Sequence, residues 1–119
     1  MKYVMNTYQG LKITLTEEFK PDDYLATINN DRVESVAIGN VSMMKHNIQT
    51  IVPEYEEAET PAGEKVIIYS NQHSEPIIAN VVGFDASAIT KKVNDRIPFI
   101  QIGDVIINRN DYSLVMPQQ

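Results

Sequence analysis

The chain has 119 residues, of which 43% are apolar and 22% are charged, a composition that is typical of one globular domain and excludes a disordered chain. The absence of cysteine excludes disulfides, thiolate nucleophiles and cysteine-bound metals. The net charge is −6 and no apolar run is long enough to span a bilayer, so we expect a cytoplasmic protein with no membrane contact.

The first part of the chain predicts two strands, a short helix and then more strands. Residues 3–5 are apolar and, with Lys2, predict an opening strand, and residues 11–16 alternate apolar and polar side chains as a half-buried strand does. Residues 21–28 begin with proline and two acids, which suit the first turn of a helix. Gly39-Asn40 then predicts the two-residue turn of a hairpin, and residues 48–52 predict a closing strand that stops at a proline.

An acidic connector, residues 56–64, follows this first part. It contains four glutamates and no basic residue, so it holds four of the six excess negative charges. Acidic side chains keep such a segment solvated. The parts on either side are nearly neutral, which argues against direct binding of nucleic acid.

The second part of the chain predicts the same elements in the same order. Strands are expected at 66–69 and 76–82, and a helix at 85–93, where Asp85 suits the N-cap and lysines suit the last turn. Gly103-Asp104 predicts another hairpin turn, and residues 112–116 predict another closing strand. In each part we expect the last three strands to form a meander.

An internal repeat explains this correspondence. Residues 30–55 align without a gap on residues 94–119, with seven identities that include Asn-Asp-Arg, Ile-Gly, Val and Pro. We therefore predict an α+β, mainly β fold, built as a tandem duplication of a β-β-α-β-β-β unit packed with pseudo-twofold symmetry. The first repeat is 1–55 and the second is 65–119. Because a unit of this size is marginal alone, the two are expected to form one compact domain.

The sequence shows no catalytic, cofactor or metal motif. His46 falls in a polar turn, and the other histidine, His73, precedes Ser74 with no third residue to complete a catalytic set. There is neither a calcium loop nor a zinc-binding helix motif, and the glycines form no phosphate-binding loop. We expect no enzyme activity, no cofactor and no metal.

The repeated Asn-Asp-Arg triplet leaves two interpretations open for Arg32 and Arg96. It follows each predicted helix, where asparagine and aspartate suit a turn and the arginine can pair with aspartate or with helix carbonyls. Alternatively, both arginines and nearby tyrosines line a pocket between the two repeats. That arrangement would make the protein a small-molecule binding module.

Our preferred hypothesis is a non-catalytic protein-interaction module. The pattern Ile-Gly-Asn/Asp-Val, a polar segment, an aliphatic strand and proline resembles short uncharacterised phage or mobile-element proteins of Gram-positive bacteria. This resemblance implies a small acidic accessory or inhibitor protein that binds a host macromolecule in the host cell cytoplasm. The concentrated negative charge of the connector favours docking on a basic host protein such as a nucleic-acid-binding protein. The predicted contact residues are Glu54, Tyr55, Glu56, Glu57 and Glu59.

Overall fold

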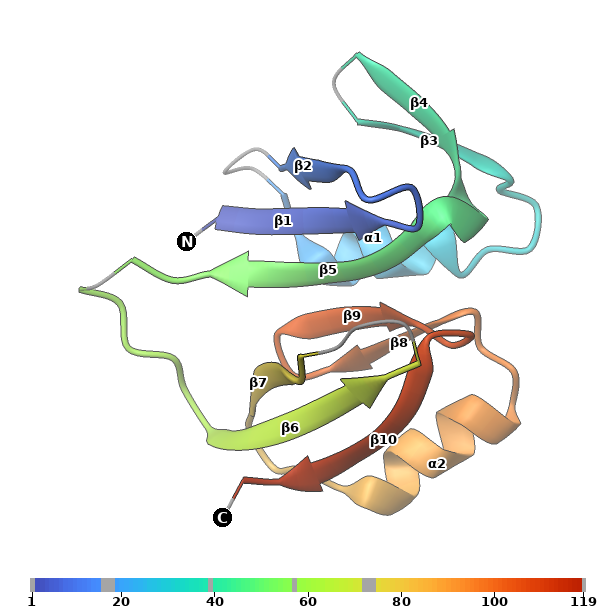
Figure 1. Ribbon diagram of the computed structural model, residues 1–119. Coiled ribbons are helices and arrows are strands. Elements are labelled where there is room, and N and C mark those ends of the chain that lie inside the picture. The colour runs from blue at the N-terminus through green and yellow to red at the C-terminus, as the bar shows by residue number, and fades with distance from the viewer. Residues whose placement is uncertain (1, 16–18, 39, 57, 72–74, 119) are drawn as a thin grey trace.

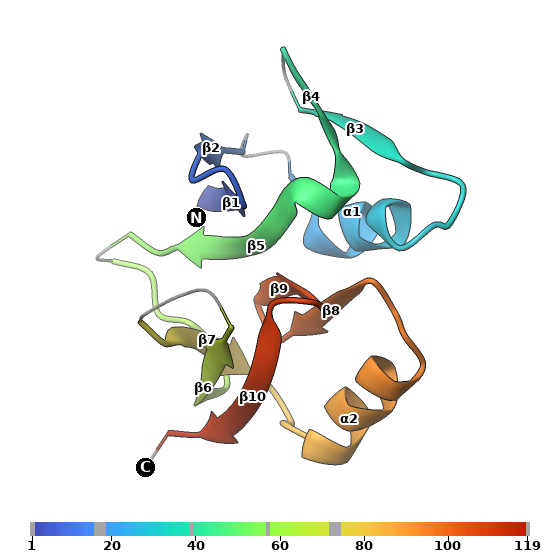
Figure 2. The same ribbon diagram turned by 45° about the vertical axis from the view of Figure 1, so that its right-hand side comes forward.

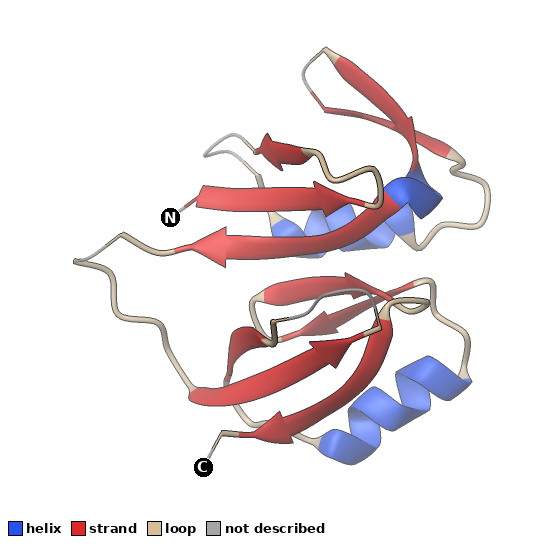
Figure 3. Cartoon of the chain, viewed as in Figure 1, coloured by secondary structure: helices blue, strands red, loops and turns tan. Residues whose placement is uncertain are grey.

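A computed structural model describes residues 2–15, 19–38, 40–56, 58–71 and 75–118. The fold is α+β and mainly β, with three antiparallel sheets, which confirms the predicted fold class. Strands dominate both halves of the chain, and one short helix lies beside the strands of each half (Figures 1 and 3).

The strands and α-helices follow the same order in both halves, and the first half also contains a 3-10 helix. The first contains β1 (Lys2–Thr7), β2 (Lys12–Thr14), α1 (Pro21–Ile28), β3 (Ser35–Ile38), β4 (Val41–Met44), the 3-10 helix η1 (Lys45–Asn47) and β5 (Ile48–Glu54). The second contains β6 (Glu64–Ser70), β7 (Ile77–Val81), α2 (Ala86–Asn94), β8 (Phe99–Ile102), β9 (Val105–Asn108) and β10 (Tyr112–Pro117). The helix α1 has the predicted bounds.

The helix α2 starts one residue later than expected because Asp85 is its N-cap. The Asp85 carboxylate accepts hydrogen bonds from the backbone N–H groups of Ser87 at 3.0 Å and Ala88 at 3.4 Å. It thereby satisfies two amides that have no partner inside the helix. The predicted capping role of Asp85 is confirmed.

The predicted meanders are wrong, although each predicted hairpin within them is formed. The strand orders are β2-β1-β5-β9-β8, β10-β6-β7 and β3-β4. The closing strands β5 and β10 therefore pair with the opening strands β1 and β6 and not with the hairpins that precede them. In the first half, η1 lies between β4 and β5 and carries the chain from the hairpin to the sheet.

The strand registers of the two halves also correspond. Opening and closing strands pair antiparallel in both, and the register shifts near the same end of each pair. An equivalent backbone hydrogen bond follows in each half, from Tyr8 N to Asn47 O at 3.0 Å and from Asn71 N to Asp111 O at 2.7 Å. The pair Tyr3↔Pro53 of the first half corresponds to Val66↔Pro117 of the second half. In the same way Met5↔Ile51 corresponds to Ile68↔Val115, and Val4↔Thr14 corresponds to Ile67↔Ile78.

Among the described strands, one pairing connects the two halves. The first-half strand β5 pairs with the second-half strand β9. A closed pseudo-twofold arrangement would also pair β10 with β4, but among the described strands β10 pairs with β6 and β4 with β3. The observed packing thus differs from the symmetric packing expected from the sequence.

The composition of the two hairpins explains this asymmetry. In β8–β9, Phe99 and Ile106 pack into one apolar cluster, while Ile100 and Ile107 on the opposite face pack into another. The hairpin β3–β4 has serines, Ser35 and Ser42, where β8–β9 has Phe99 and Ile106. Only the second hairpin is apolar on both faces, so only that hairpin is suited to burial between two layers.

Two apolar clusters form the core, and both draw on both halves. Phe99 and Ile106 of the second half lie in the first cluster, and Val52 of the first half packs against the second. Figure 2 shows β5 and β9 between the two helices, with α1 beside the upper layer and α2 beside the lower one. The first cluster contains Tyr3, Met5, Leu15, Ile28, Val36, Ile48 and Ile51, and the second Val66, Ile68, Ala79, Ile89, Ile100, Ile102, Val105 and Ile107.

Candidate functional site

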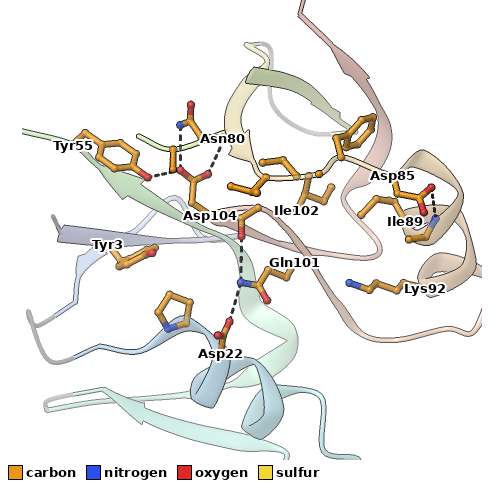
Figure 4. A pocket seen from close by; sticks show the side chains of 18 residues that line it. Tyr3, Asp22, Tyr55, Asn80, Asp85, Ile89, Lys92, Gln101, Ile102 and Asp104 are labelled. Atoms are coloured by element: carbon orange, nitrogen blue, oxygen red, sulfur yellow. Dashed lines mark hydrogen bonds between the residues drawn. The ribbon is translucent and has the colours of Figure 1, made fainter. Parts of the chain in front are cut away.

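A pocket of about 640 Å³ lies where the two halves meet (Figure 4). The first half contributes residues of β1 and the start of α1, and the second half contributes the β8–β9 turn and one side of α2. The volume falls within the range of small-molecule sites. Its polar or aromatic lining residues are Tyr3, Asp22, Tyr55, Asn80, Phe84, Asp85, Lys92, Gln101 and Asp104.

Asp104, in the β8–β9 turn, is the centre of the polar network in this pocket. Its carboxylate accepts a hydrogen bond from the Tyr55 hydroxyl at 2.6 Å, from the Asn80 backbone N–H at 3.0 Å and from the Asn80 side-chain amide at 3.2 Å. Asp104 therefore ties the segment after β5 and the strand β7 to the β8–β9 turn. Three donors already satisfy this carboxylate.

Gly103 lets the turn approach β7 this closely. Its φ is +59°, a left-handed conformation that glycine adopts without strain. A Cβ atom at this position would overlap the backbone carbonyl of Asn80. The Gly103-Asp104 pair thus serves both the hairpin turn, as predicted, and the docking of the hairpin on β7.

Gln101 makes a second polar link across the pocket. Its side-chain amide donates to Asp22 of α1 at 3.2 Å and to the Gly103 carbonyl at 3.2 Å. Together with the capping bonds of Asp85, these contacts give each of the three carboxylates that line the pocket a donor within the protein. The pocket's polar groups therefore hold the halves together.

The phenols in the pocket are held in their neutral form. Burial, followed by the hydrogen bond and the negative charge of Asp104, raises the pKa of Tyr55 well above its ordinary value. Burial, followed by the charges of Asp104 and Asp22, also raises the pKa of Tyr3. Near neutral pH both tyrosines are hydrogen-bond donors and not bases or nucleophiles.

Arg32 and Arg96 do not line this pocket. Both are exposed, and the backbone N–H of Arg32 donates to the side chain of Asn30 at 3.0 Å, which is the turn geometry expected after the helix. Arg96 has a φ of +60°, so in the second half the arginine and not the asparagine takes the left-handed conformation. Of the predicted pocket residues, the structure brings only tyrosines to the junction of the halves.

The predicted contact residues Glu54, Tyr55 and Glu56 follow one another at the end of β5 and just beyond it. Glu54 and Glu56 are exposed, whereas Tyr55 is partly covered and its hydroxyl binds Asp104. A Glu59 carboxylate oxygen accepts a hydrogen bond from the Glu56 backbone N–H at 2.9 Å. Glu57 lies outside the described residues.

The structure describes one of the two histidines. His46 is exposed in η1, and the predicted pair His73 and Ser74 lies outside the described residues. Within the described ranges, no three residues of metal-ligating type come together. Nor does any described helix have the length and apolar character needed to cross a membrane.

Sequence reasoning missed an apolar surface on the sheet β10-β6-β7. The strand registers place five apolar side chains on the face of this sheet opposite the core, which we call the outer face. They are Leu114 and Met116 of β10, Ile67 and Tyr69 of β6, and Ile78 of β7. The exposed fractions of four of them are 44% for Leu114, 39% for Met116, 39% for Tyr69 and 42% for Ile78. The signal was present in the sequence, because all three strands carry consecutive apolar residues, a pattern that predicts burial of both faces.

Comparisons with protein-family models, curated proteins and solved structures find no match. The surface and the pocket are therefore the basis for assigning a function.

Proposed function

We propose that the protein is a non-catalytic protein-interaction module that binds its partner through the outer face and the adjoining edge of β10. The observation that carries this proposal is the exposure of the outer face. Contiguous exposed apolar side chains mark binding surfaces in soluble proteins. The apolar side chains along β10, which are 39–44% exposed at Met116 and Leu114, would contribute affinity when a partner covers them.

The edge of β10 supplies the second element of this surface. Within the described part of the chain β10 pairs with β6 on one side, and no strand is paired to its other side. Backbone N–H and C=O groups along an edge can bind an added strand, while neighbouring side chains provide selectivity. The strand has no charged residue between Tyr112 and Pro117 that would oppose such an addition.

We further propose that the module arose by tandem duplication. The shared element order, the matching registers and the corresponding hydrogen bonds of Tyr8 and Asn71 support this origin. Duplication also accounts for the outer face. The corresponding first-half face is buried at Thr50 and packs through Val52 against the second half, whereas the second-half face is exposed at the equivalent residues Leu114 and Met116.

We also propose that the partner is a basic protein, as expected for an acidic accessory or inhibitor protein of phage type. Glu54 and Glu56 are exposed at the end of β5 and beyond it, on the segment that leads to the connector. Their charge would speed docking on a basic protein and make association sensitive to salt. Replacing Glu54, Glu56, Glu57 and Glu59 by glutamine should then weaken binding most at low ionic strength, and an unchanged affinity would exclude an acidic contact.

Site-specific photo-crosslinking tests the proposed surface. A photoreactive phenylalanine analogue at Tyr69 would lie on the outer face, and the same analogue at Thr90, an exposed position of α2, is the matched control. In extract from the source cells we expect position 69 to give a discrete crosslinked protein and position 90 to give none. Absence of any protein adduct at position 69, or equal labelling at both positions, would contradict the proposal.

The pocket between the halves supports a second candidate function, a small-molecule binding module. Its specific observation is a cavity of about 640 Å³ lined by both halves, whose lining includes Lys92 and three aspartates. A ligand bridging the halves would raise the unfolding temperature. A thermal-shift screen of metabolites and nucleotides tests this candidate, and loss of any shift in Lys92→Ala would place the ligand in this pocket.

A further inference from the structure

The contact between the two halves provides a template for a second contact. In β5 and β9 the register is Thr50↔Ile107 and Ile51↔Ile106. The Asn29 side chain supports this junction, because its Oδ1 accepts from the Phe99 N–H at 2.8 Å and its Nδ2 donates to the Phe99 carbonyl at 3.0 Å. The closing strand of one unit thus receives the second hairpin strand of the other.

The counterparts of these two strands are β10 and β4. The structure describes no strand paired to the outer side of either one. Figures 1 and 2 show β4 at the top of the molecule and β10 at the bottom, on opposite sides of the two core layers. One chain cannot bring these two edges together, but two chains can.

We propose that the protein self-associates head to tail, with β10 of one copy adding antiparallel to β4 of a second copy. This inference rests on the proposed function, because it uses the same edge of β10, and it adds a second copy of the chain as a binding partner. Transferring the register of β5 and β9 by the sixty-four positions that separate the aligned repeats places Leu114 opposite Met43 of the second copy, and Val115 opposite Ser42. The same register places Met116 opposite Val41.

The side chains at these positions suit the contact. Met116 and Val41 are 39% and 40% exposed, and Leu114 is 44% exposed, so pairing would cover apolar surface on both edges. Neither β4 nor β10 contains a lysine, arginine, aspartate or glutamate, the residues that usually protect an edge strand from addition. The edge strand β2, by comparison, contains Lys12.

The contact between copies should be weaker than the contact within a chain. The hairpin β3–β4 has Ser42 and Ser35 at the positions where β8–β9 has the buried Ile106 and Phe99. The contact between copies therefore covers less apolar area. Met44 replaces Asn108, whose side chain donates to the Ile48 carbonyl at 2.9 Å and adds a polar tie within the chain. We expect dissociation constants of roughly micromolar order, which corresponds to a reversible contact of small area.

Two single variants and their mixture test the head-to-tail geometry. Val41→Lys blocks β4 and Met116→Lys blocks β10, both at exposed positions, and circular dichroism and thermal unfolding establish that each variant folds. We expect the wild-type protein to give a mass that rises with concentration beyond that of a dimer in analytical ultracentrifugation, because a heterologous contact need not close. Each variant alone should remain monomeric, and the equimolar mixture should stop at a dimer.

The mixture distinguishes this arrangement from a symmetric dimer. In a symmetric dimer that pairs β10 with β10, the Val41→Lys variant would remain dimeric. The Met116→Lys variant would stay monomeric even after it is mixed with Val41→Lys. A register test follows from combining Val41→Glu with Met116→Lys in one chain, which places opposite charges face to face and should restore self-association in a salt-sensitive manner. If either variant fails to fold, Leu114→Lys replaces Met116→Lys, and Ser42→Lys, at another exposed position of β4, replaces Val41→Lys.

Three outcomes would overturn the inference: a wild-type protein that stays monomeric up to millimolar concentration, a single-edge variant that still self-associates, or a mixture without dimers. A monomeric protein that nevertheless gives the crosslink at position 69 to a different protein would contradict head-to-tail assembly alone. The absence of any protein adduct together with a monomeric state would contradict the proposed function as well.

Discussion

Replacing Gly103 by alanine tests how the second hairpin is docked. Gly103 has a φ of +59°, and a Cβ atom there would lie 2.7 Å from Cγ2 of Val81 and 2.9 Å from the carbonyl carbon of Asn80, in addition to overlapping the Asn80 carbonyl oxygen. The turn would have to move away from β7. That movement would lengthen the hydrogen bonds between Asn80 and Asp104, which are 3.0 and 3.2 Å long.

Two contributions determine the size of the effect. A left-handed conformation costs alanine about 1–2 kcal/mol relative to glycine. The steric overlap against backbone adds about 1–3 kcal/mol. We therefore expect Gly103→Ala to lower the free energy of unfolding by about 2–5 kcal/mol, and the melting temperature by about 4 °C for each kcal/mol.

Gly10→Ala is the matched control because Gly10 has a φ of +84° and no atom within 4 Å of a Cβ built there. It should lose only the conformational contribution of about 1–2 kcal/mol. Urea unfolding of both variants at neutral pH, followed by circular dichroism, measures the difference. Equal losses for the two variants would refute the steric role of Gly103 in docking the hairpin on β7.

Three further predictions concern single residues. Asp111 is fully buried and its carboxylate has no hydrogen-bond partner among the described residues. Asp111→Asn introduces the residue found at the equivalent Asn47 and should raise the free energy of unfolding by about 1 kcal/mol in urea titrations. A lower free energy of unfolding would show that the protein stabilises the Asp111 carboxylate. Arg96→Gly should maintain or raise the melting temperature, because glycine adopts the φ of +60° at this position without strain. The control Arg32→Gly should lower the free energy of unfolding by about 1 kcal/mol. Equal effects of the two substitutions would contradict backbone strain at Arg96. Burial raises the pKa of Tyr55, so its contribution to stability is complete below the ordinary value of 10.0 and is lost as the pH rises through the folded-state pKa. Tyr55→Phe should therefore show a smaller loss of stability above pH 10.0 than the wild-type protein in alkaline unfolding titrations, and identical alkaline profiles would contradict this role.

Local chemistry was sufficient to predict the individual elements. Proline and acids at the start of Pro21–Ile28, and the cap formed by Asp85, determine where the helices begin. Glycine at 103 provides the left-handed turn of the β8–β9 hairpin. These features act over a few residues, so the sequence reveals them directly.

Pairing between distant strands was not predictable in the same way. The closing strands β5 and β10 have the apolar content of meander strands, yet they pair with the opening strands β1 and β6. The one-sided junction depends on the difference between Phe99 and Ser35 and between Ile106 and Ser42, which matters only once two layers are packed. Sequence periodicity does not report which strand edge meets which.

The candidate site was predicted in part. A pocket at the junction of the halves was the alternative interpretation of the sequence, and the lining of the observed pocket contains Tyr3 and Tyr55 and not the arginines. Tyr55 was assigned to an acidic contact surface because it stands among glutamates, whereas its hydroxyl binds Asp104 forty-nine residues away in the chain. Its neighbours in sequence gave no information about that contact.

Hydrogen–deuterium exchange measured over a series of protein concentrations tests the central claim, the use of β4 and β10 as complementary edges. The strand β5 is paired on both sides within one chain, so its amides should be protected at every concentration. The amides of Val41–Met44 and Tyr112–Pro117 should become more protected as concentration rises, and Met116→Lys should abolish the increase in both segments. Protection in these two strands that does not change with concentration, or an increase confined to other strands, would contradict the claim.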